Sequence, residues 1–249
     1  MRVLVLRPER AARRTADALR GLGHTPVLAP VLAITDLSNP IPDGPFDAVL
    51  ATSANGLRKL AVRREIERLR SAPLIAVGDR TAEAGCEAGF VAVHVAEGDG
   101  RALVAEALRL FPSPARFLHA AGADRAFDLA GALSFHGHRV DLVELYKAEA
   151  AATLPPAIAE ALAAPEDLAV LHHSGRIAET FLALVDGAGL GEVARAVPHA
   201  ALAERIARAL RDAGCRRVET AERPDEQALL KTLDRLDANG SPSAFRRTK

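Results

Sequence analysis

Short apolar segments that run almost directly into a helix recur along this chain of 249 residues, and this alternation constrains its fold more than any other feature. Glycine, proline or hydroxyl residues follow close behind each segment, and most of the stretches that come next have apolar residues at helical spacing. The segments span residues 3–7, 47–51, 74–77, 116–119 and 168–171. Strand and helix in alternation predict an α/β fold, with parallel sheets covered by helices on both faces.

Length and composition predict two globular domains of modest size. The chain is longer than one domain of about 150 residues, and 49% of it is hydrophobic, which excludes a disordered or collagen-like protein. Lys plus Arg and Asp plus Glu number 32 each. Because no net positive field would attract polyanions, we expect neither nucleic acid nor membrane as a partner.

The sequence also predicts where in the cell the protein is found and whether it needs a metal or a cofactor. No apolar run approaches the roughly 18 residues of a membrane helix, and the first apolar run is too short for a signal peptide, which predicts a cytoplasmic protein. Cys86 and Cys215 lack the spacing of a metal site or a disulfide framework. We therefore predict no metal and no cofactor.

The chain repeats itself in the order A, B, A′, B′. Three pairs of segments match: 2–24 with 116–138, 49–53 with 170–174, and 78–89 with 203–214. This pattern predicts two related α/β halves. Extended, proline-containing passages at 31–45 and 143–156 separate the pieces, and they predict two strands that connect the halves.

Three strand ends carry small or hydroxyl residues immediately before a helix: Thr52-Ser53-Ala54-Asn55, Gly78-Asp79-Arg80-Thr81 and His173-Ser174-Gly175. Ligands of open α/β sheets bind at the carboxyl ends of the strands, and free helix N-terminal amides attract carboxylates or phosphates. The alternative is that Ser53, Thr81 and Ser174 only cap their helices. Both interpretations stay open at this point.

Signatures of common enzyme classes are absent, including Gly-x-Ser-x-Gly, the phosphate loop and Gly-x-Gly-x-x-Gly. His172 and His173 precede Ser174, but adjacent strand side chains point to opposite faces, which favours structural histidines over an activated serine. His136-Gly137-His138 falls where a helix stops, which favours a surface turn over a metal site. The sequence thus argues against hydrolases, kinases and dehydrogenases.

The order and spacing of several motifs resemble the uroporphyrinogen-III synthase family over nearly the whole chain except its tail. The matching pieces include Val5-Leu6-Arg7-Pro8, Thr52-Ser53-Ala54-Asn55-Gly56, Val77-Gly78-Asp79-Arg80-Thr81-Ala82, Arg125, Tyr146-Lys147 and Ser174. The resemblance implies two flavodoxin-like parallel-sheet domains joined by a two-stranded antiparallel linker. It places the first domain at 1–33 plus 151–239, the second at 42–141, and the linker at 34–41 and 142–150. The tail, 240–249, is expected to be disordered.

The resemblance also implies a reaction, the cyclisation of hydroxymethylbilane to uroporphyrinogen III with loss of water and inversion of ring D in the interdomain cleft. Such an enzyme is a lyase of heme biosynthesis. Its substrate closes by itself to the wrong isomer, so the protein must control geometry rather than supply a nucleophile. We expect a monomer that receives its substrate by transient handover from hydroxymethylbilane synthase.

The family's linker tyrosine falls on Tyr146, which the resemblance makes the catalytic residue, since a phenol is a protonated hydrogen-bond donor at neutral pH. Its alternative is a tyrosine that packs a connecting strand. The substrate-binding residues implied are Thr52, Ser53, Asn55, Thr81, Ser174 and Arg7. The second Gly-x-x-Thr-Ala turn departs from the pattern, with Ala203 for glycine and Ile206 for threonine. This departure keeps open a non-catalytic tetrapyrrole-binding or regulatory module, and a sugar- or amino-acid-binding clamp is a third possibility.

Overall fold

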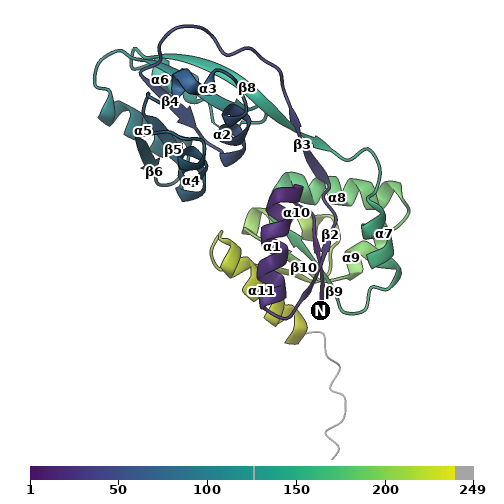
Figure 1. The fold of residues 1–249 in the computed structure, drawn as a ribbon. Coiled ribbons are helices and arrows are strands. Elements are labelled where there is room, and N and C mark those ends of the chain that lie inside the picture. The colour runs from purple at the N-terminus through teal and green to yellow at the C-terminus, as the bar shows by residue number, and fades with distance from the viewer. Residues whose placement is uncertain (126, 239–249) are drawn as a thin grey trace, which may run out of the picture. The chain divides into compact units, whose positions relative to one another are not determined.

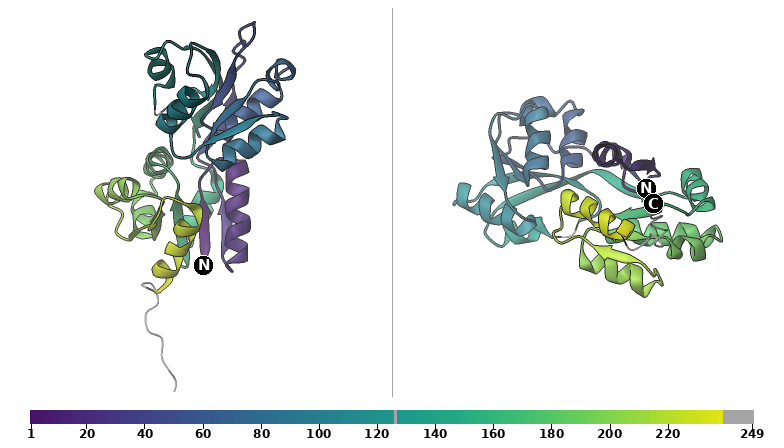
Figure 2. Two further views of the ribbon diagram at one scale, coloured as in Figure 1. Left: turned by 90° about the vertical axis from the view of Figure 1, so that its left-hand side faces the viewer. Right: turned by 90° about the horizontal axis from the view of Figure 1, so that it is seen from below.

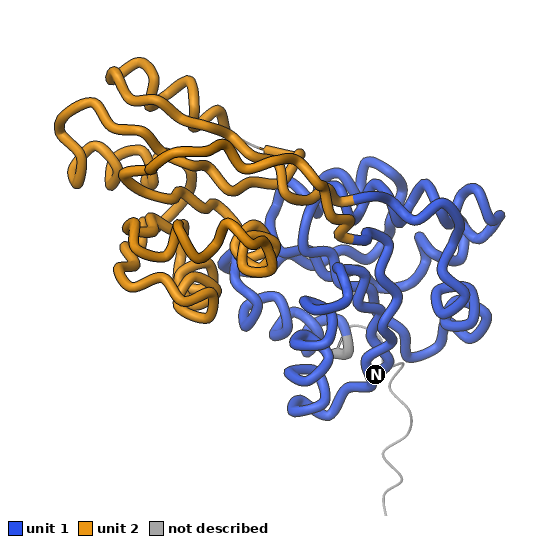
Figure 3. Tube along the Cα trace, turned by 45° about the horizontal axis from the view of Figure 1, so that its top comes forward, with its two compact units in different colours: residues 1–33, 149–249 blue, residues 34–148 orange. Residues whose placement is uncertain are grey.

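Parallel strands build two separate sheets in the computed structural model, which describes residues 1–125 and 127–238 (Figure 1). The chain divides into two compact units, which Figure 3 shows in different colours. Unit 1 combines Met1–Ala33 with the chain from Glu149 onward, and unit 2 is Ile34–Ala148. The chain therefore leaves unit 1, builds unit 2 and returns. The predicted tail, 240–249, lies outside the described residues.

The sheet of unit 1 has the strand order β11-β10-β9-β1-β2, with neighbours parallel. Its strands are β1 (Arg2–Val5), β2 (Thr25–Leu28), β9 (Leu168–His172), β10 (His199–Ala201) and β11 (Val218–Thr220). In order along the chain they give 2-1-3-4-5, which is the flavodoxin-like arrangement. The predicted fold class is confirmed in this unit.

Helices cover both faces of this sheet (Figure 2). The apolar side chains of β9 alternate between the faces, Val170 toward one and Leu171 toward the other. The face with Val170 is covered by α7 (Pro156–Ala163), α8 (Gly175–Gly187), α9 (Gly191–Ala196) and α10 (Glu204–Asp212). The other is covered by α1 (Glu9–Gly21) and α11 (Glu226–Ala238).

The sheet of unit 2 has the order β3-β8-β7-β4-β5-β6. Its strands are β3 (Leu32–Asp36), β4 (Ala48–Ala51), β5 (Leu74–Val77), β6 (Val93–Ala96), β7 (Arg116–Gly122) and β8 (Arg139–Ala150). One face is covered by α2 (Ala54–Ala61), α3 (Ile66–Leu69) and α4 (Asp79–Glu87). The other is covered by α5 (Gly100–Leu110) and α6 (Leu129–Ser134).

The two connecting strands, β3 and β8, pair with each other. The Leu37 N–H donates to the Leu145 carbonyl and the Ala151 N–H to the Val31 carbonyl, each at 2.9 Å. Because one partner number rises as the other falls, the pair is antiparallel, as expected. Both strands also extend the edge of the unit 2 sheet, and the division between the units falls within them, after Ala33 and after Ala148.

The internal repeat explains why five strands of each sheet are arranged alike, with β3 added beside β8 in unit 2. In unit 2, β7, α6 and β8 take the places that β1, α1 and β2 take in unit 1. Likewise β4, β5 and β6 correspond to β9, β10 and β11. Each unit therefore contains one A-type and one B-type piece, and the chain passes between the units to combine them.

Candidate functional site

The turn after β4 carries three of the predicted binding residues, Thr52, Ser53 and Asn55. Ser53 has extended backbone, and its Oγ accepts the Asn55 N–H at 3.2 Å, which makes it the N-cap of α2. Thr52 is exposed, and Ser53 and Asn55 are half-buried. Ser53 therefore does cap α2, and Thr52 is the most exposed residue of this turn.

The turn after β5 begins α4 in a different way. Gly78 has a φ of +71° with a ψ of 160°, a conformation that essentially only glycine adopts. Thr81 is the third residue of the helix and is 5% exposed, and its N–H donates to the Gly78 carbonyl at 3.1 Å. The alternative that Thr81 caps the helix is wrong, because Gly78 occupies the N-cap position. Parallel pairing of Ala51 with Ala76 puts this turn beside that of Ser53.

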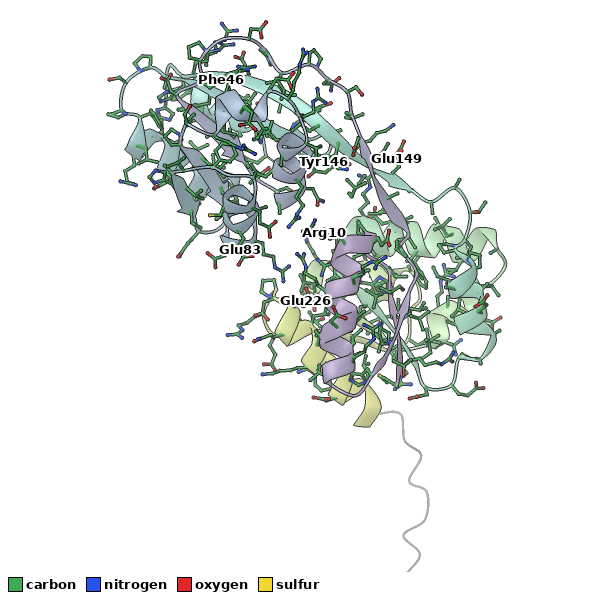
Figure 4. All side chains as sticks on the ribbon, in the orientation of Figure 1. Arg10, Phe46, Glu83, Tyr146, Glu149 and Glu226 are labelled. Carbon is green, nitrogen blue, oxygen red and sulfur yellow. The ribbon has the colours of Figure 1, made fainter. Side chains whose placement is uncertain are left out.

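Tyr146 lies on β8 (Figure 4), level with the carboxyl ends of the neighbouring parallel strands, where these two turns also lie. It pairs with Gly122, the last residue of β7, and its carbonyl accepts the Ala123 N–H at 2.8 Å. Its half-buried ring packs against the apolar cluster beneath α2 and α4. Since β8, β7, β4 and β5 are successive neighbours, unit 2 collects five predicted residues at one sheet edge. We call this the unit 2 cluster: Thr52, Ser53, Asn55, Thr81 and Tyr146.

The remaining predicted residues, Arg7 and Ser174, lie in unit 1, where they follow the paired strands β1 and β9. The Ser174 Oγ accepts the Ile177 N–H at 3.3 Å and caps α8. Arg7 donates from Nη1 to Glu226 Oε2 at 2.8 Å and to Thr15 Oγ1 at 3.2 Å. The predicted substrate-binding arginine is thus held by a carboxylate of its own chain.

Glu226 is the functional-site candidate that the sequence did not reveal. Besides Arg7, its carboxylate accepts a hydrogen bond from Thr15 and lies 3.6 Å from His173 Nε2. Burial by itself would raise the pKa of this carboxyl, but hydrogen bonds from His173 and Thr15 and the charge of Arg7 lower it well below its usual range. We call Arg7, Thr15, His173 and Glu226 the unit 1 cluster.

The turn in unit 1 that matches Gly78 to Thr81 explains why Ala203 and Ile206 are tolerated. Ala203 has φ −151° and ψ 154°, extended backbone that any residue adopts, so glycine is not required. Ile206 is 2% exposed and packs with Leu210 and Ala178 in the core beneath α10. The lost hydroxyl is therefore replaced by core packing.

The histidine motifs have structural partners. His172 is fully buried, and its Nε2 lies 3.0 Å from Nδ1 of His199. The predicted turn is present at Gly137, which has a φ of +82°. The prediction that it lies at the surface is wrong for His138, which is buried. Its Nδ1 accepts the Ala115 N–H at 3.1 Å. Over residues 1–125 and 127–238, no three His, Cys, Asp or Glu side chains gather as a metal site would require.

Gly56 lets α2 approach β7 closely, and this contact supports the unit 2 cluster. A Cβ added at Gly56 would lie 2.5 Å from the Ala120 carbonyl oxygen, a backbone atom that cannot turn away. We expect Gly56→Ala to lower the free energy of unfolding by about 1–3 kcal/mol in urea titrations. Gly21→Ala, at a helical position with nothing within 4 Å, is the matched control. An unchanged midpoint for Gly56→Ala would contradict this packing.

The family model and the solved structures that match this chain point to one family. A family model described as uroporphyrinogen-III synthase HemD matches residues 13–231. A mutant uroporphyrinogen III synthase from the extreme thermophile Thermus thermophilus is 25% identical, with 96% of this chain and 99% of that chain covered and a TM-score of 0.52. The uroporphyrinogen-III synthetase of Helicobacter pylori has the same fold, with 18% identity, 86% and 93% coverage and a TM-score of 0.65.

No curated protein matches the sequence. None of the helices in the described part of the chain combines the length and the apolar character needed to span a membrane.

Proposed function

The chain belongs to the uroporphyrinogen-III synthase family, and from this premise we propose that it cyclises hydroxymethylbilane to uroporphyrinogen III. One observation carries the proposal beyond family membership. A phenol, two hydroxyls, an amide side chain and a buried threonine, the unit 2 cluster, share one edge of a parallel sheet, where ligands of such sheets bind. The enzyme is a lyase, and ring D is inverted as water is lost.

The reaction requires the protein to control the geometry in which the substrate closes its ring. Hydroxymethylbilane closes by itself without inversion, so binding must favour the approach that inverts ring D. The substrate is a polycarboxylate, and the strand-end turns offer helix N-terminal amides with partial positive charge. A chain without net charge can bind a polyanion in this way, because the favourable field is local to the turns.

Tyr146 acts in this proposal as the hydrogen-bond donor to the departing hydroxyl, which leaves as water. Ring A is then an azafulvene, and ring D attacks it through its substituted carbon to give a spiro intermediate. That intermediate fragments and closes again with ring D inverted. Preorganised donors of this kind act where charge develops in the transition state.

The proposed substrate contacts are Thr52, Ser53, Asn55, Thr81, Ser174 and Arg7. Ser53 and Ser174 already cap helices, so their neighbouring amides are the more available donors. Arg7 can bind a substrate carboxylate only if it releases Glu226 or binds both carboxylates at once. We also propose that the enzyme works as a cytoplasmic monomer and receives its unstable substrate by transient handover from hydroxymethylbilane synthase.

The deciding experiment supplies freshly prepared hydroxymethylbilane to the purified protein and separates the uroporphyrinogen isomers after oxidation. An excess of isomer III above the spontaneous background supports the synthase. Isomer I alone, at the spontaneous rate, would leave a tetrapyrrole-binding or regulatory module.

Tyr146→Phe removes the phenol oxygen and keeps the ring. Positioned proton donors contribute about 10²–10⁴-fold to catalysis, so we expect kcat for isomer III to fall by about 100-fold. Stopped-flow mixing with separation of the isomers measures this, and the thermal midpoint of the variant serves as the folding control. Unchanged turnover would leave Tyr146 a packing residue of β8.

A further inference from the structure

We propose that Gly122 is a positioning residue for the synthase reaction, because the absence of a side chain there lets the phenol of Tyr146 lie against the end of β7. This inference rests on the proposed function of Tyr146. Gly122 lies opposite Tyr146 in the pairing of β7 with β8, at a shift in register between Ala121 and Gly122. The shift brings the ring of Tyr146 over the glycine.

The contact leaves no room for a side chain. A Cβ built on Gly122 would lie 2.7 Å from Cζ of Tyr146 and 2.9 Å from both Cε2 and Oη, closer than real Cβ contacts. Gly122 is not among the described glycines with positive φ, so its backbone does not require glycine. The reason for glycine at this position is therefore steric, and the group that it accommodates is the phenol.

The backbone around this contact is held from both strands, so a side chain at 122 would displace the ring rather than the strands. The Ala123 N–H donates to the Tyr146 carbonyl at 2.8 Å. Arg125 donates from Nη1 to the Gly122 carbonyl at 3.0 Å and to Glu144 of β8 at 2.6 Å. Arg125 thus ties the end of β7 to β8 two residues before Tyr146.

The composition makes the inference directly measurable. The chain has a single tyrosine and no tryptophan, so tyrosine fluorescence and the tyrosine band of the near-ultraviolet circular dichroism spectrum report on Tyr146 alone. For Gly122→Ala we expect a changed tyrosine band and at least twofold stronger quenching of the fluorescence by acrylamide. We expect kcat for isomer III to fall by about tenfold while KM changes less than twofold, as for a lost transition-state contact.

Two glycines provide matched controls. Gly187→Ala adds a Cβ in open space at the end of α8 in unit 1. Gly85→Ala perturbs the packing of unit 2 against Leu74 of β5, which β4 and β7 separate from β8. We expect both to leave the tyrosine signals unchanged. The double variant Gly122→Ala, Tyr146→Phe should be no less active than Tyr146→Phe alone, because the two changes act on one group.

The outcomes separate this inference from the proposed function. Unchanged tyrosine signals in Gly122→Ala would overturn the role of Gly122, and so would additive losses in the double variant. Altered signals with full activity in both Gly122→Ala and Tyr146→Phe would uphold the contact and refute the catalytic tyrosine. If Gly122→Ala fails to fold, the wild-type protein still gives the test: nuclear Overhauser contacts between Gly122 α-protons and the tyrosine ring are expected, and their absence overturns the inference.

Discussion

Unfolding by urea is expected to become easier as the pH falls from 6.5 toward 4, because three buried histidines stay neutral in the folded protein while the unfolded chain binds protons on them. His119, His172 and His199 are all 2% exposed or less. Burial lowers the pKa of His119 to about 4, with the charge of Arg125 adding to the effect, and burial likewise lowers that of His199 to about 4. The pKa of His172 is lowered by burial and by its histidine neighbours.

The direction follows from where the protons are. In this range the unfolded chain binds protons on these imidazoles while the folded protein does not, so acid favours the unfolded state. Each lowered pKa of His119 and His199 corresponds to about 3 kcal/mol of stability that is present at pH 7 and lost progressively toward pH 4. The contribution of His119 belongs to unit 2 and that of His199 to unit 1.

Hydrogen bonds fix the neutral form of the pair in unit 1. His199 Nε2 lies 2.9 Å from the Ala194 carbonyl and must donate to it. Its Nδ1 is then the acceptor for the Nε2–H of His172, 3.0 Å away. A further proton on His199 would place two donors face to face, while Nδ1 of His172 is buried without a hydrogen-bond partner. Protonation of His199 at low pH therefore breaks the hydrogen bond between the two rings as well as placing a charge in the core.

Urea titrations at half-unit pH steps, followed by circular dichroism, measure the effect. His119→Leu removes one titrating group, and Nε2 of His119 has no hydrogen-bond partner to lose. We expect this variant to flatten the pH dependence of unit 2 by up to about 1.4 kcal/mol per pH unit between pH 6.5 and 4. His136→Gln, at an exposed histidine after α6, is the control. A wild-type midpoint that does not change over this range would refute the prediction.

Local signals were sufficient for the strands of the five apolar segments and for several of the turns behind them. Hydroxyl and glycine residues behind each apolar segment predicted strand ends, and Ser53 and Ser174 do cap α2 and α8. The repeated segments predicted related halves, because each piece keeps its own short-range pattern wherever the chain places it. Gly78 shows the limit of this reasoning. Its turn needs a positive φ, while the matching turn at Ala203 does not. The spacing of residues in the sequence does not predict this difference in backbone angles.

Long-range contacts were beyond the sequence. Arg7 and Glu226 are 219 positions apart, and nothing near either residue indicates its partner. The available signal was weak: Asp225 and Glu226 precede an apolar repeat, which is typical of a helix start, and Asp225 does cap α11 by accepting the Ala228 N–H. Sequence pattern could place Glu226 on a helix, but only the fold brings it to the end of β1.

Replacing Glu226 should have the largest effect of any single side chain in the unit 1 cluster. Arg7 and Glu226 are 16% and 19% exposed, so removing the carboxylate leaves a desolvated guanidinium without its charge partner. Glu226 also stands in the first turn of α11, where a negative charge is favourable. We expect Glu226→Leu to lower the free energy of unfolding of unit 1 by about 3 kcal/mol, since breaking such pairs costs more than deleting both partners.

The double variant Arg7→Met, Glu226→Leu tests that reasoning, because it removes the pair as a whole and should recover most of the lost stability. Glu9→Gln, which breaks the exposed pair of Glu9 with Arg13, is the matched surface control and should change little.

The difference in free energy of unfolding between wild type and Glu226→Leu should be full above pH 4.5 and shrink as the pH falls below it. The reason is that the folded-state pKa of Glu226 is lowered and the carboxylate stabilises only while charged. Hydrogen exchange should localise the loss to α11. A double variant as unstable as Glu226→Leu would show that the carboxylate acts through Thr15 or His173 rather than through Arg7.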